Sequence, residues 1–195
     1  MGKIFCLMGK SSTGKDTIYK ALLQDKEMEL RHIVSYTTRP IRAGENNGTE
    51  YFFTDDRQLQ EYRKNRAVIE ERAYTTYYGI WYYFTVADEQ IDLHHQNYLI
   101  IGTPESFLAV REYFGQEKVV PILITVDDGV RLQRALNREK KQKEPRYEEM
   151  CRRFLADSAD FAADKIKEAG INRAFINENL DECMKNIKRY ITENR

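Results

Sequence analysis

A glycine-rich loop directly follows the first apolar segment of the chain and strongly constrains the fold. Residues 3–8, KIFCLM, are short and apolar, which predicts a buried parallel strand. Gly9, Gly14 and Lys15 then match the spacing G-x-x-x-x-G-K of phosphate-binding loops. Residues 16–27 have the apolar spacing of a helix. A strand, this loop and a helix in that order predict an α/β fold with an anion-binding loop at the start of the helix.

One position of the loop departs from the pattern, because Asp16 stands where a hydroxyl residue is expected. Either Asp16 holds Mg²⁺, directly or through water, or the Thr17 hydroxyl does so. A third interpretation treats Asp16 only as a favourable anion in the first helical turn. We favour a magnesium-linked Asp16, since an anion beside bound phosphates needs a cation between them. The candidate residues for a nucleoside triphosphate are Gly9, Lys10, Ser11, Ser12, Thr13, Gly14, Lys15, Asp16 and Thr17, with Mg²⁺ as cofactor.

Apolar strands and amphipathic helices alternate along most of the remaining chain. Strands are predicted at 31–38, 98–103, 119–126 and 174–177, and helices at 104–114, 127–139, 146–168 and 180–194. This alternation predicts a mostly parallel sheet covered by helices on both faces. Residues 39–86 differ, because a turn-rich loop, one helix and strands rich in Tyr and Thr follow one another there. We interpret them as a small mixed insertion over one end of the main sheet.

Charge and composition argue against several classes of protein. Lys and Arg together number 31, as do Asp and Glu, so the net charge is zero and nothing favours binding to a nucleic-acid backbone. No apolar run approaches the length of a membrane span. The three cysteines, Cys6, Cys151 and Cys183, are scattered without metal-ligand spacing, which predicts reduced thiols in a cytoplasmic protein.

A second motif, SYTTRPIRAGENNGTEY, runs from Ser35 to Tyr51. Arg39 and Arg42 lie three residues apart on a loop that Pro40 stiffens. Two guanidinium groups can grip a phosphate through forked hydrogen bonds, and the Tyr51 phenol can add a donor. The motif therefore predicts a second anion site, apart from the glycine-rich loop.

This second motif resembles, without a gap, the acceptor-binding segment of guanylate kinases, S-x-T-T-R-x-x-R-x-G-E-x-x-G-x-x-Y. Further segments resemble that family in the same order along the chain. The segment IEERAYTTYYG is similar to the family's acidic residue and the Tyr-Tyr-Gly turn that follows it. The segments LQRALNRE and EEMCRRFLADSADF are similar to the family's lid. The segment FINENLDEC is similar to the family's last strand and last helix. The resemblance covers nearly the whole chain.

The resemblance implies an α/β fold of the P-loop NTPase type, with three layers and a mostly parallel central sheet. A small mixed insertion would bind a nucleoside monophosphate, and an arginine-rich lid would close over the site. We expect a single domain, 1–195, with its core at about 1–34, 87–137 and 154–195, the insertion at about 35–86 and the lid at about 138–153. We expect a monomer or a homodimer.

The resemblance also implies a reaction, the transfer of a phosphoryl group from ATP to a nucleoside monophosphate, with GMP favoured. Glu70 would accept hydrogen bonds from N1 and the amino group of guanine, and Asn177 would lie near adenine. The implied acceptor-binding residues are Ser35, Arg39, Arg42, Tyr51, Glu70, Tyr78 and Thr103. The implied catalytic residues are Lys15, Arg39, Arg134, Arg138 and Arg153. These cations suit phosphoryl transfer, which depends on positioning and on neutralising negative charge.

Two positions depart from the family's base-reading pattern. Thr103 stands in place of an aspartate that helps to read guanine, and Ile80 in place of a hydroxyl that donates to guanine O6. Thr103, Thr75 or Thr76 are candidates to compensate. Two alternatives stay open: a similar kinase for ribose 1,5-bisphosphate, whose loop also carries Gly-Lys-Asp, and a non-catalytic module that binds protein partners. Such modules typically lose the phosphate loop, which this chain retains.

Overall fold

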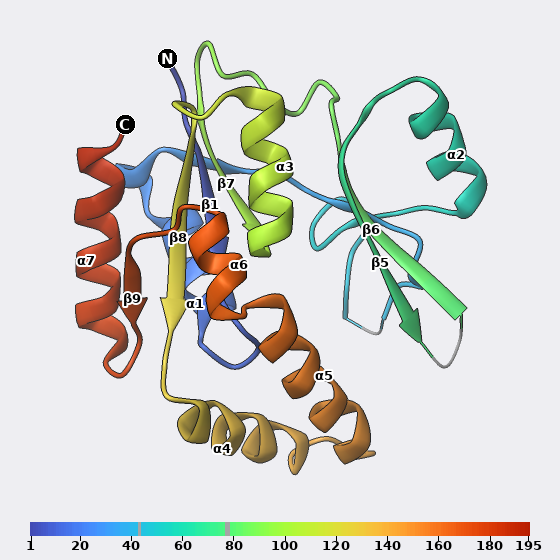
Figure 1. The fold of residues 1–195 in the computed structure, drawn as a ribbon, viewed down its shortest axis with the longest axis vertical. Helices are drawn as coiled ribbons and strands as arrows, with labels where there is room; N and C mark the ends of the chain where they lie inside the picture. Colours follow the sequence, from blue (N-terminus) through green and yellow to red (C-terminus); the bar gives the residue numbers. More distant parts are fainter. Residues whose placement is uncertain (43, 77–78) are drawn as a thin grey trace.

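A five-stranded parallel sheet forms the centre of the molecule (Figure 1). The computed structural model describes residues 1–42, 44–76 and 79–195. The strand order is β2-β7-β1-β8-β9, and every neighbouring pair is parallel. The strands are β1 (Ile4–Met8), β2 (Leu30–His32), β7 (Asn97–Gly102), β8 (Val119–Thr125) and β9 (Ala174–Ile176). This order confirms the predicted mostly parallel central sheet.

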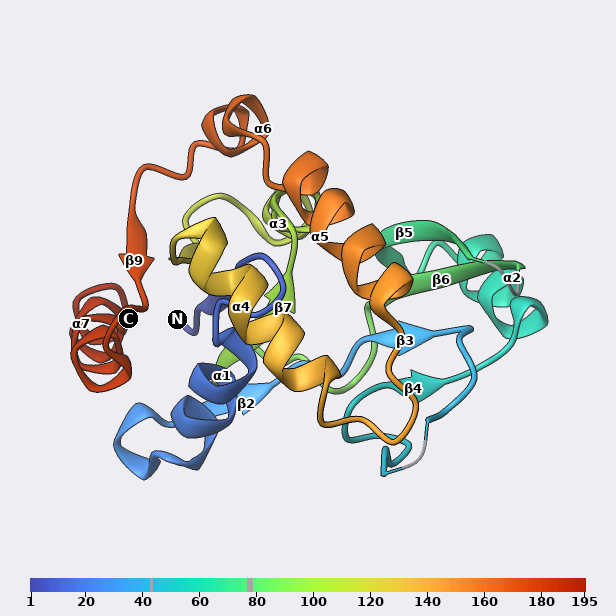
Figure 2. The ribbon, with the colours of Figure 1, turned by 90° about the horizontal axis from the view of Figure 1, so that it is seen from below.

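Helices cover both faces of this sheet because alternate residues of its strands point to opposite sides. Ile4, Cys6 and Met8 belong to one buried apolar cluster, whereas Phe5 and Leu7 belong to another. Helices α3 and α6 close the first cluster, and helices α1 and α7 close the second, as Figure 2 shows from below. These helices are α1 (Lys15–Gln24), α3 (Pro104–Phe114), α6 (Ala163–Glu168) and α7 (Leu180–Glu193). The three-layer α/β prediction is confirmed.

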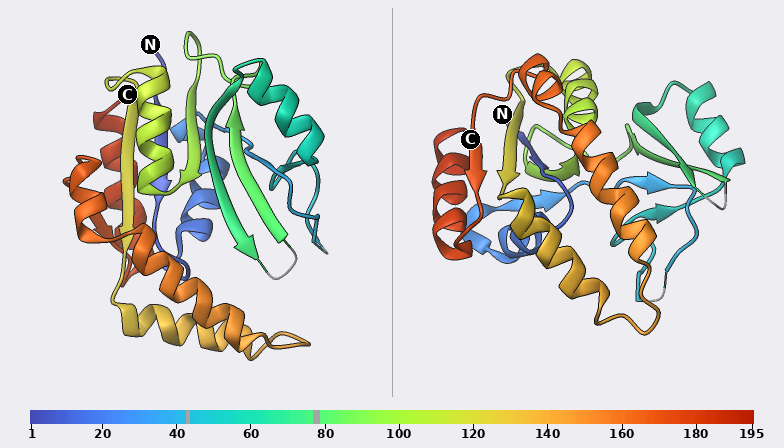
Figure 3. Two further views of the ribbon diagram at one scale, coloured as in Figure 1. Left: turned by 45° about the vertical axis from the view of Figure 1, so that its right-hand side comes forward. Right: turned by 60° about the horizontal axis from the view of Figure 1, so that its bottom comes forward.

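A smaller mixed sheet lies beside the central one, in the order β4-β3-β6-β5. Its elements are β3 (Tyr36–Thr37), β4 (Phe52–Phe53), α2 (Asp56–Lys64), β5 (Val68–Thr76) and β6 (Gly79–Val86). Leu59 of α2 packs with Phe84 and Val86 in a small apolar core of its own. Strand β5 also packs against α3, so the long β5–β6 hairpin stands next to the central sheet (Figure 3).

Helices α4 (Asp128–Glu139) and α5 (Tyr147–Asp160) lie beyond the carboxyl end of β8 (Figure 1). They pack against each other, and α5 runs between α4 and the β5–β6 hairpin (Figure 2). Ligands of open α/β sheets bind outside the carboxyl ends of the strands. The arrangement therefore brings the glycine-rich loop, the two helices and the small sheet to one end of the molecule.

Two predicted elements are wrong in part. The strand predicted at 31–38 is divided between β2 and β3, which belong to different sheets. The helix predicted at 146–168 is broken after Asp160, because Phe161 leaves the helical conformation and is buried in the core against the central sheet. Within the described part of the chain, no helix combines the length and the hydropathy needed to cross a membrane.

Candidate active site

The glycine-rich loop joins β1 to α1 at the carboxyl end of the central sheet. Gly14 has a φ of 90°, a conformation that favours glycine. A Cβ at Gly14 would also lie 2.3 Å from Nδ2 of Asn177, and one at Gly9 would lie 2.8 Å from the Ile124 carbonyl oxygen. Both glycines are therefore required by close packing as well as by the phosphate-loop pattern.

Asn177 connects the glycine-rich loop to the end of β8 through two hydrogen bonds. Its side chain Nδ2 donates to the Thr13 carbonyl at 2.7 Å, and its backbone N–H donates to the Thr125 carbonyl at 2.8 Å. The residue is 4% exposed. The contact near adenine implied by the family resemblance stays a prediction, whereas the contact that the structure records is with the loop itself.

A cavity of about 150 Å³ opens in front of the loop. Its lining residues are Ser12, Gly14, Lys15, Asp16, Thr17, Arg134 and Arg138. The first-turn amides of α1 have no acceptor within the helix, and the helix dipole adds a partial positive charge there. Ser12 Oγ is buried and has no hydrogen-bond partner among the described residues. A cationic pocket with an unpaired buried donor fits a chain of phosphate groups.

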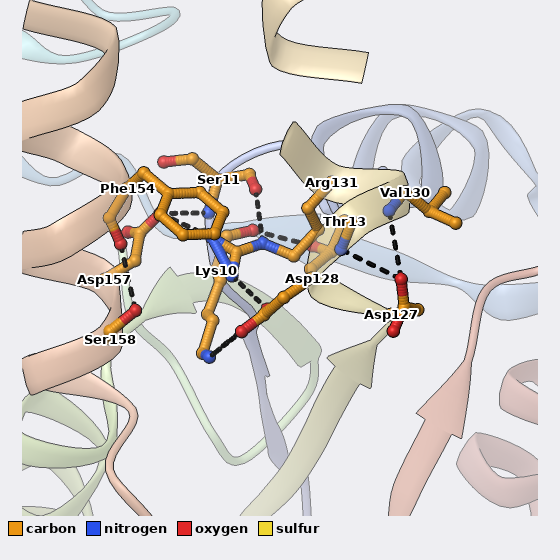
Figure 4. Close-up of polar contacts among 11 residues, drawn as sticks. Lys10, Ser11, Thr13, Asp127, Asp128, Val130, Arg131, Phe154, Asp157 and Ser158 are labelled. Carbon is orange, nitrogen blue, oxygen red and sulfur yellow. Dashed lines mark hydrogen bonds and ion pairs between the residues drawn. The ribbon is translucent and has the colours of Figure 1, made fainter. Parts of the chain in front are cut away.

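The underside of the loop is held by a buried arginine on α4 (Figure 4). Arg131 is 1% exposed, and its Nε donates to the Ser11 carbonyl at 3.0 Å. Its Nη1 donates to Asp128 at 2.6 Å and its Nη2 to Asp157 of α5 at 3.5 Å. Asp157 in turn accepts a hydrogen bond from the Ser11 amide at 2.7 Å. The Ser11 amide, predicted to face a triphosphate, is thus paired with a carboxylate of the protein.

The three predicted lid arginines lie on two different helices, α4 and α5. Arg134 and Arg138 of α4 line the cavity, and Arg134 Nη2 also donates to the Asn177 carbonyl at 3.2 Å. Arg153 lies on α5, where its Nε donates to Glu149 at 3.0 Å. Burial lowers the pKa of Arg42, and the positive charges of Arg39 and Arg153 lower it further.

Arg39 is the buried cation of the second anion motif. It is 3% exposed, and its two terminal nitrogens each donate to Glu45 at 2.9 Å. Its guanidinium lies 5.4 Å from the ring centre of Tyr51 and 5.3 Å from that of Phe53. Its Nε is buried without a hydrogen-bond partner in the described part of the chain. Arg39 therefore keeps one free donor, which fits an anionic ligand.

Tyr51 connects this motif with the loop. Burial raises the pKa of the Tyr51 phenol, and the carboxylate of Asp16 adds to that rise. The two predicted anion motifs therefore lie at the same end of the molecule, with the Tyr51 phenol within electrostatic reach of Asp16.

Glu70 lies on β5 with its carboxylate buried, at 5% exposure of the residue. It accepts hydrogen bonds from Arg72 Nε at 3.0 Å and from the Thr85 hydroxyl at 2.8 Å. The Ser35 hydroxyl lies 3.4 Å from that of Thr85. Glu70 and Ser35, two predicted acceptor-binding residues, thus belong to one buried polar cluster.

The remaining predicted acceptor residues lie elsewhere or are not described. The Thr103 hydroxyl accepts from the Ser106 amide at 3.2 Å, so this residue caps the start of α3. Ile80 is 51% exposed and pairs with Thr75 near the end of the β5–β6 hairpin. Tyr78 lies outside the described residues.

Sequence reasoning missed Arg72, Arg131 and Asp157. The position of Arg72 could have been predicted from the sequence, because Arg72 follows Glu70 by two residues. Side chains two residues apart in a strand lie on the same face of the sheet. Arg131 and Asp157 carry no such signal. Their partner Ser11 lies 120 residues before Arg131 and 146 residues before Asp157.

Together these features define a class of protein: an α/β protein with a P-loop cavity and a small mixed sheet beside the central one. A family model described as guanylate kinase matches residues 1–194. The chain belongs to the guanylate kinase family.

Relatives and a solved structure agree with this assignment. The chain is 30% identical over 193 residues to a guanylate kinase of Caldanaerobacter subterraneus, covering 97% of this chain and 86% of that protein. It is 27% identical over 197 residues to a guanylate kinase of Mesomycoplasma hyopneumoniae, covering 99% and 95%. The fold matches a crystal structure of guanylate kinase from Anaplasma phagocytophilum with a TM-score of 0.66, at 20% identity, covering 98% of this chain and 85% of that one.

Proposed function

We propose that the protein transfers the γ-phosphoryl group of ATP to GMP. The observation that carries this proposal is the cavity in which Lys15 of the loop and Arg134 and Arg138 of α4 meet. Membership of the guanylate kinase family supports the same reaction. Phosphoryl transfer needs cations around the transferring group rather than a covalent nucleophile, and this cavity supplies them.

We assign the residues to two substrates. Lys15, Arg134 and Arg138 bind the phosphates of ATP, together with the amides that begin α1. Arg39, Arg42, Tyr51 and Ser35 bind the phosphate of GMP, and Glu70 reads its base. The ion pair with Glu45 holds Arg39 in place while its Nε stays free for the ligand. Arg153 approaches the transferring group when α5 closes, since its charge already acts on Arg42 of the second anion motif.

The loop also fits a magnesium ion. Asp16 and Thr17 line the cavity beside Lys15, whose Nζ is 3.3 Å from Asp16 Oδ1. Among the described residues, no group of three or more His, Cys, Asp or Glu could form a cage for a metal. Mg²⁺ in kinases uses one or two protein ligands and completes its shell with phosphates and water, so Asp16 and Thr17 suffice. When bound, Mg²⁺ neutralises the charge on the phosphate groups.

The alternatives raised by the sequence are not favoured. A family match over residues 1–194 supports a nucleotide acceptor rather than ribose 1,5-bisphosphate. The intact loop cavity and its arginines support catalysis rather than a module that only binds proteins. We further propose a cytoplasmic location, because Cys6, Cys151 and Cys183 are free thiols, as is usual in a reducing compartment.

A coupled assay that reports ADP tests the reaction. Purified protein with ATP and Mg²⁺ is offered GMP, dGMP, AMP, UMP, CMP and ribose 1,5-bisphosphate. We expect turnover with GMP far above the other ribonucleoside monophosphates, and a loss of at least about 100-fold in Lys15→Met, since electrostatic groups at a transition state have effects of this size. Turnover with ribose 1,5-bisphosphate alone, or with none of these acceptors despite ATP binding, would refute the proposal.

A further inference from the structure

An arginine stands directly beside the carboxylate that the proposed function assigns to the base. Arg72 donates from Nε to Glu70 Oε2 at 3.0 Å and from Nη2 to Glu70 Oε1 at 3.4 Å. The side chains are 16% and 3% exposed. Both residues point to the same face of β5, because they are two apart in the strand.

The pair is largely buried, on the strand that packs against α3 of the central layer. Burial raises the pKa of the Cys6 thiol on β1 to about 12, and the charge of Glu70 adds to the rise. Arg72 is opposite Tyr83 in the β5–β6 pairing, and the rings of Tyr74 and Tyr83 are 5.5 Å apart. Aromatic rings therefore lie close to the pair, which suits a planar base.

Arg72 has donors to spare. A guanidinium carries five N–H groups in a fixed fork, and Glu70 uses one on Nε and one on Nη2. The two N–H groups of Nη1 and the second N–H of Nη2 remain beyond this pair, and a hydrogen bond with the Tyr74 phenol engages one of these three donors. The Arg72 side chain keeps 16% of its surface exposed.

The two positions that depart from the family's base-reading pattern are not suited to donate to the base. Ile80 carries no polar side-chain group, and it pairs with Thr75, five residues beyond Glu70 or roughly 16 Å along the strand. The Thr103 hydroxyl caps α3. The Thr85 hydroxyl already donates to Glu70 at 2.8 Å. A guanine bound by Glu70 through N1 and its amino group would still need a donor for O6.

We propose that Arg72 determines specificity for guanine by donating to O6 and N7 while Glu70 accepts from N1 and the amino group. A carboxylate and a guanidinium side by side match the guanine edge, which presents donors at N1 and N2 and acceptors at O6 and N7. Arginine paired with O6 and N7 is the commonest specific contact to guanine in nucleic-acid recognition. The inference rests on the proposed function, because it concerns the acceptor of that same reaction.

Analogues of GMP separate the two halves of this recognition. 7-Deaza-GMP lacks the N7 acceptor but keeps N1, O6 and the amino group, so it reports on Arg72. Inosine monophosphate lacks only the amino group, so it reports on Glu70. We expect the wild-type protein to prefer GMP to 7-deaza-GMP by about tenfold in kcat/KM, toward the lower end of what such a contact provides. Arg72→Met should abolish this preference and retain the preference for GMP over inosine monophosphate.

A matched control comes from Glu71, the residue between Glu70 and Arg72 on the same strand, and from its arginine partner on α2. Arg63 of α2 forms an ion pair with Glu71, through Nε at 2.8 Å, with side chains 33% and 23% exposed. Arg63→Met should therefore remove an arginine–glutamate pair from the hairpin without changing either preference. Thermal unfolding of both variants checks that they are folded.

The outcomes distinguish the inference from the proposed function. Failure of the wild-type protein to phosphorylate GMP refutes both. If the wild-type protein phosphorylates GMP and 7-deaza-GMP with equal kcat/KM, the role of Arg72 is refuted and the proposed function stands. If Arg72→Met loses the preference over inosine monophosphate while keeping that over 7-deaza-GMP, Arg72 only positions Glu70, and the inference is overturned.

Discussion

Replacing Arg131 by Met should destabilise the protein by about 3 kcal/mol and weaken ATP binding. The guanidinium is 1% exposed and is shared among the Ser11 carbonyl, Asp128 and Asp157. It also lies 4.6 Å from the ring centre of Phe154 on α5. Its removal takes away one of the links between the loop and the two helices beyond the carboxyl end of β8.

The magnitude follows from which partners are left unpaired. A buried carbonyl without its donor costs about 1–3 kcal/mol. Breaking a fully buried ion pair costs about 3–5 kcal/mol, but here Asp128 and Asp157 are 53% and 17% exposed and can be partly hydrated. We therefore expect about 3 kcal/mol in total, which corresponds to a fall in Tm of roughly 6–12 °C in a chain of this size.

Urea unfolding of four proteins measures this effect: the wild type, Arg131→Met, Asp157→Ala and the double variant. We expect a coupling energy of about 1 kcal/mol between Arg131 and Asp157, since both contact Ser11. Arg152→Met is the control, because its ion pair with Glu149 is 46% and 42% exposed, so it should cost about 1 kcal/mol or less. An Arg131→Met protein as stable as this control, with an unchanged KM for ATP, would refute the reasoning.

Two further predictions concern carboxylates of the site. Asp16→Ala should raise the Mg²⁺ concentration for half-maximal activity several-fold, because Asp16 lines the loop cavity. Its Tm should barely move, since the side chain is 71% exposed; an unchanged Mg²⁺ titration would make Asp16 a helix-start anion only. The hydrogen bond from Arg39 lowers the pKa of Glu45 from its ordinary 4.5. The stabilisation of the folded protein by the Arg39–Glu45 pair is thus complete above pH 4.5. It is lost as the pH falls through the lowered pKa of Glu45 in the folded protein. Thermal melts of the wild type and Glu45→Gln should therefore converge in acid, and a constant difference would contradict this.

The phosphate loop and the general architecture could be predicted because their signals are local. The run KIFCLM, the spacing of Gly9, Gly14 and Lys15, and the helix that follows are contiguous in the chain. Each element forms from neighbouring residues, and the alternation of strands and helices then restricts the topology to a covered parallel sheet. The helix predicted at 146–168 failed at Phe161 because burial of that ring in the core overrode a continuous helical pattern.

The polar contacts of the site could be predicted only where sequence distance is short. Arg72 and Glu70 are two residues apart, so the period of a strand places both side chains on one face, but it does not show that they pair. Asn177 was recognised as a site residue by resemblance, but its bond to the Thr13 carbonyl joins positions 164 residues apart. No spacing rule selects such a partner, because the choice depends on which side chains the packed helices bring to the loop.

The chemical groups of the site could be read from the sequence: a glycine-rich loop with Lys15, the arginines of the second anion motif and of the lid, and the acid Glu70. Which of these groups are already paired depends on the packed structure. Arg39 is held by Glu45, Glu70 is held by Arg72, and the Ser11 amide is taken by Asp157. The physical reason is that buried charges and donors must find partners, and packing determines which partners lie within reach.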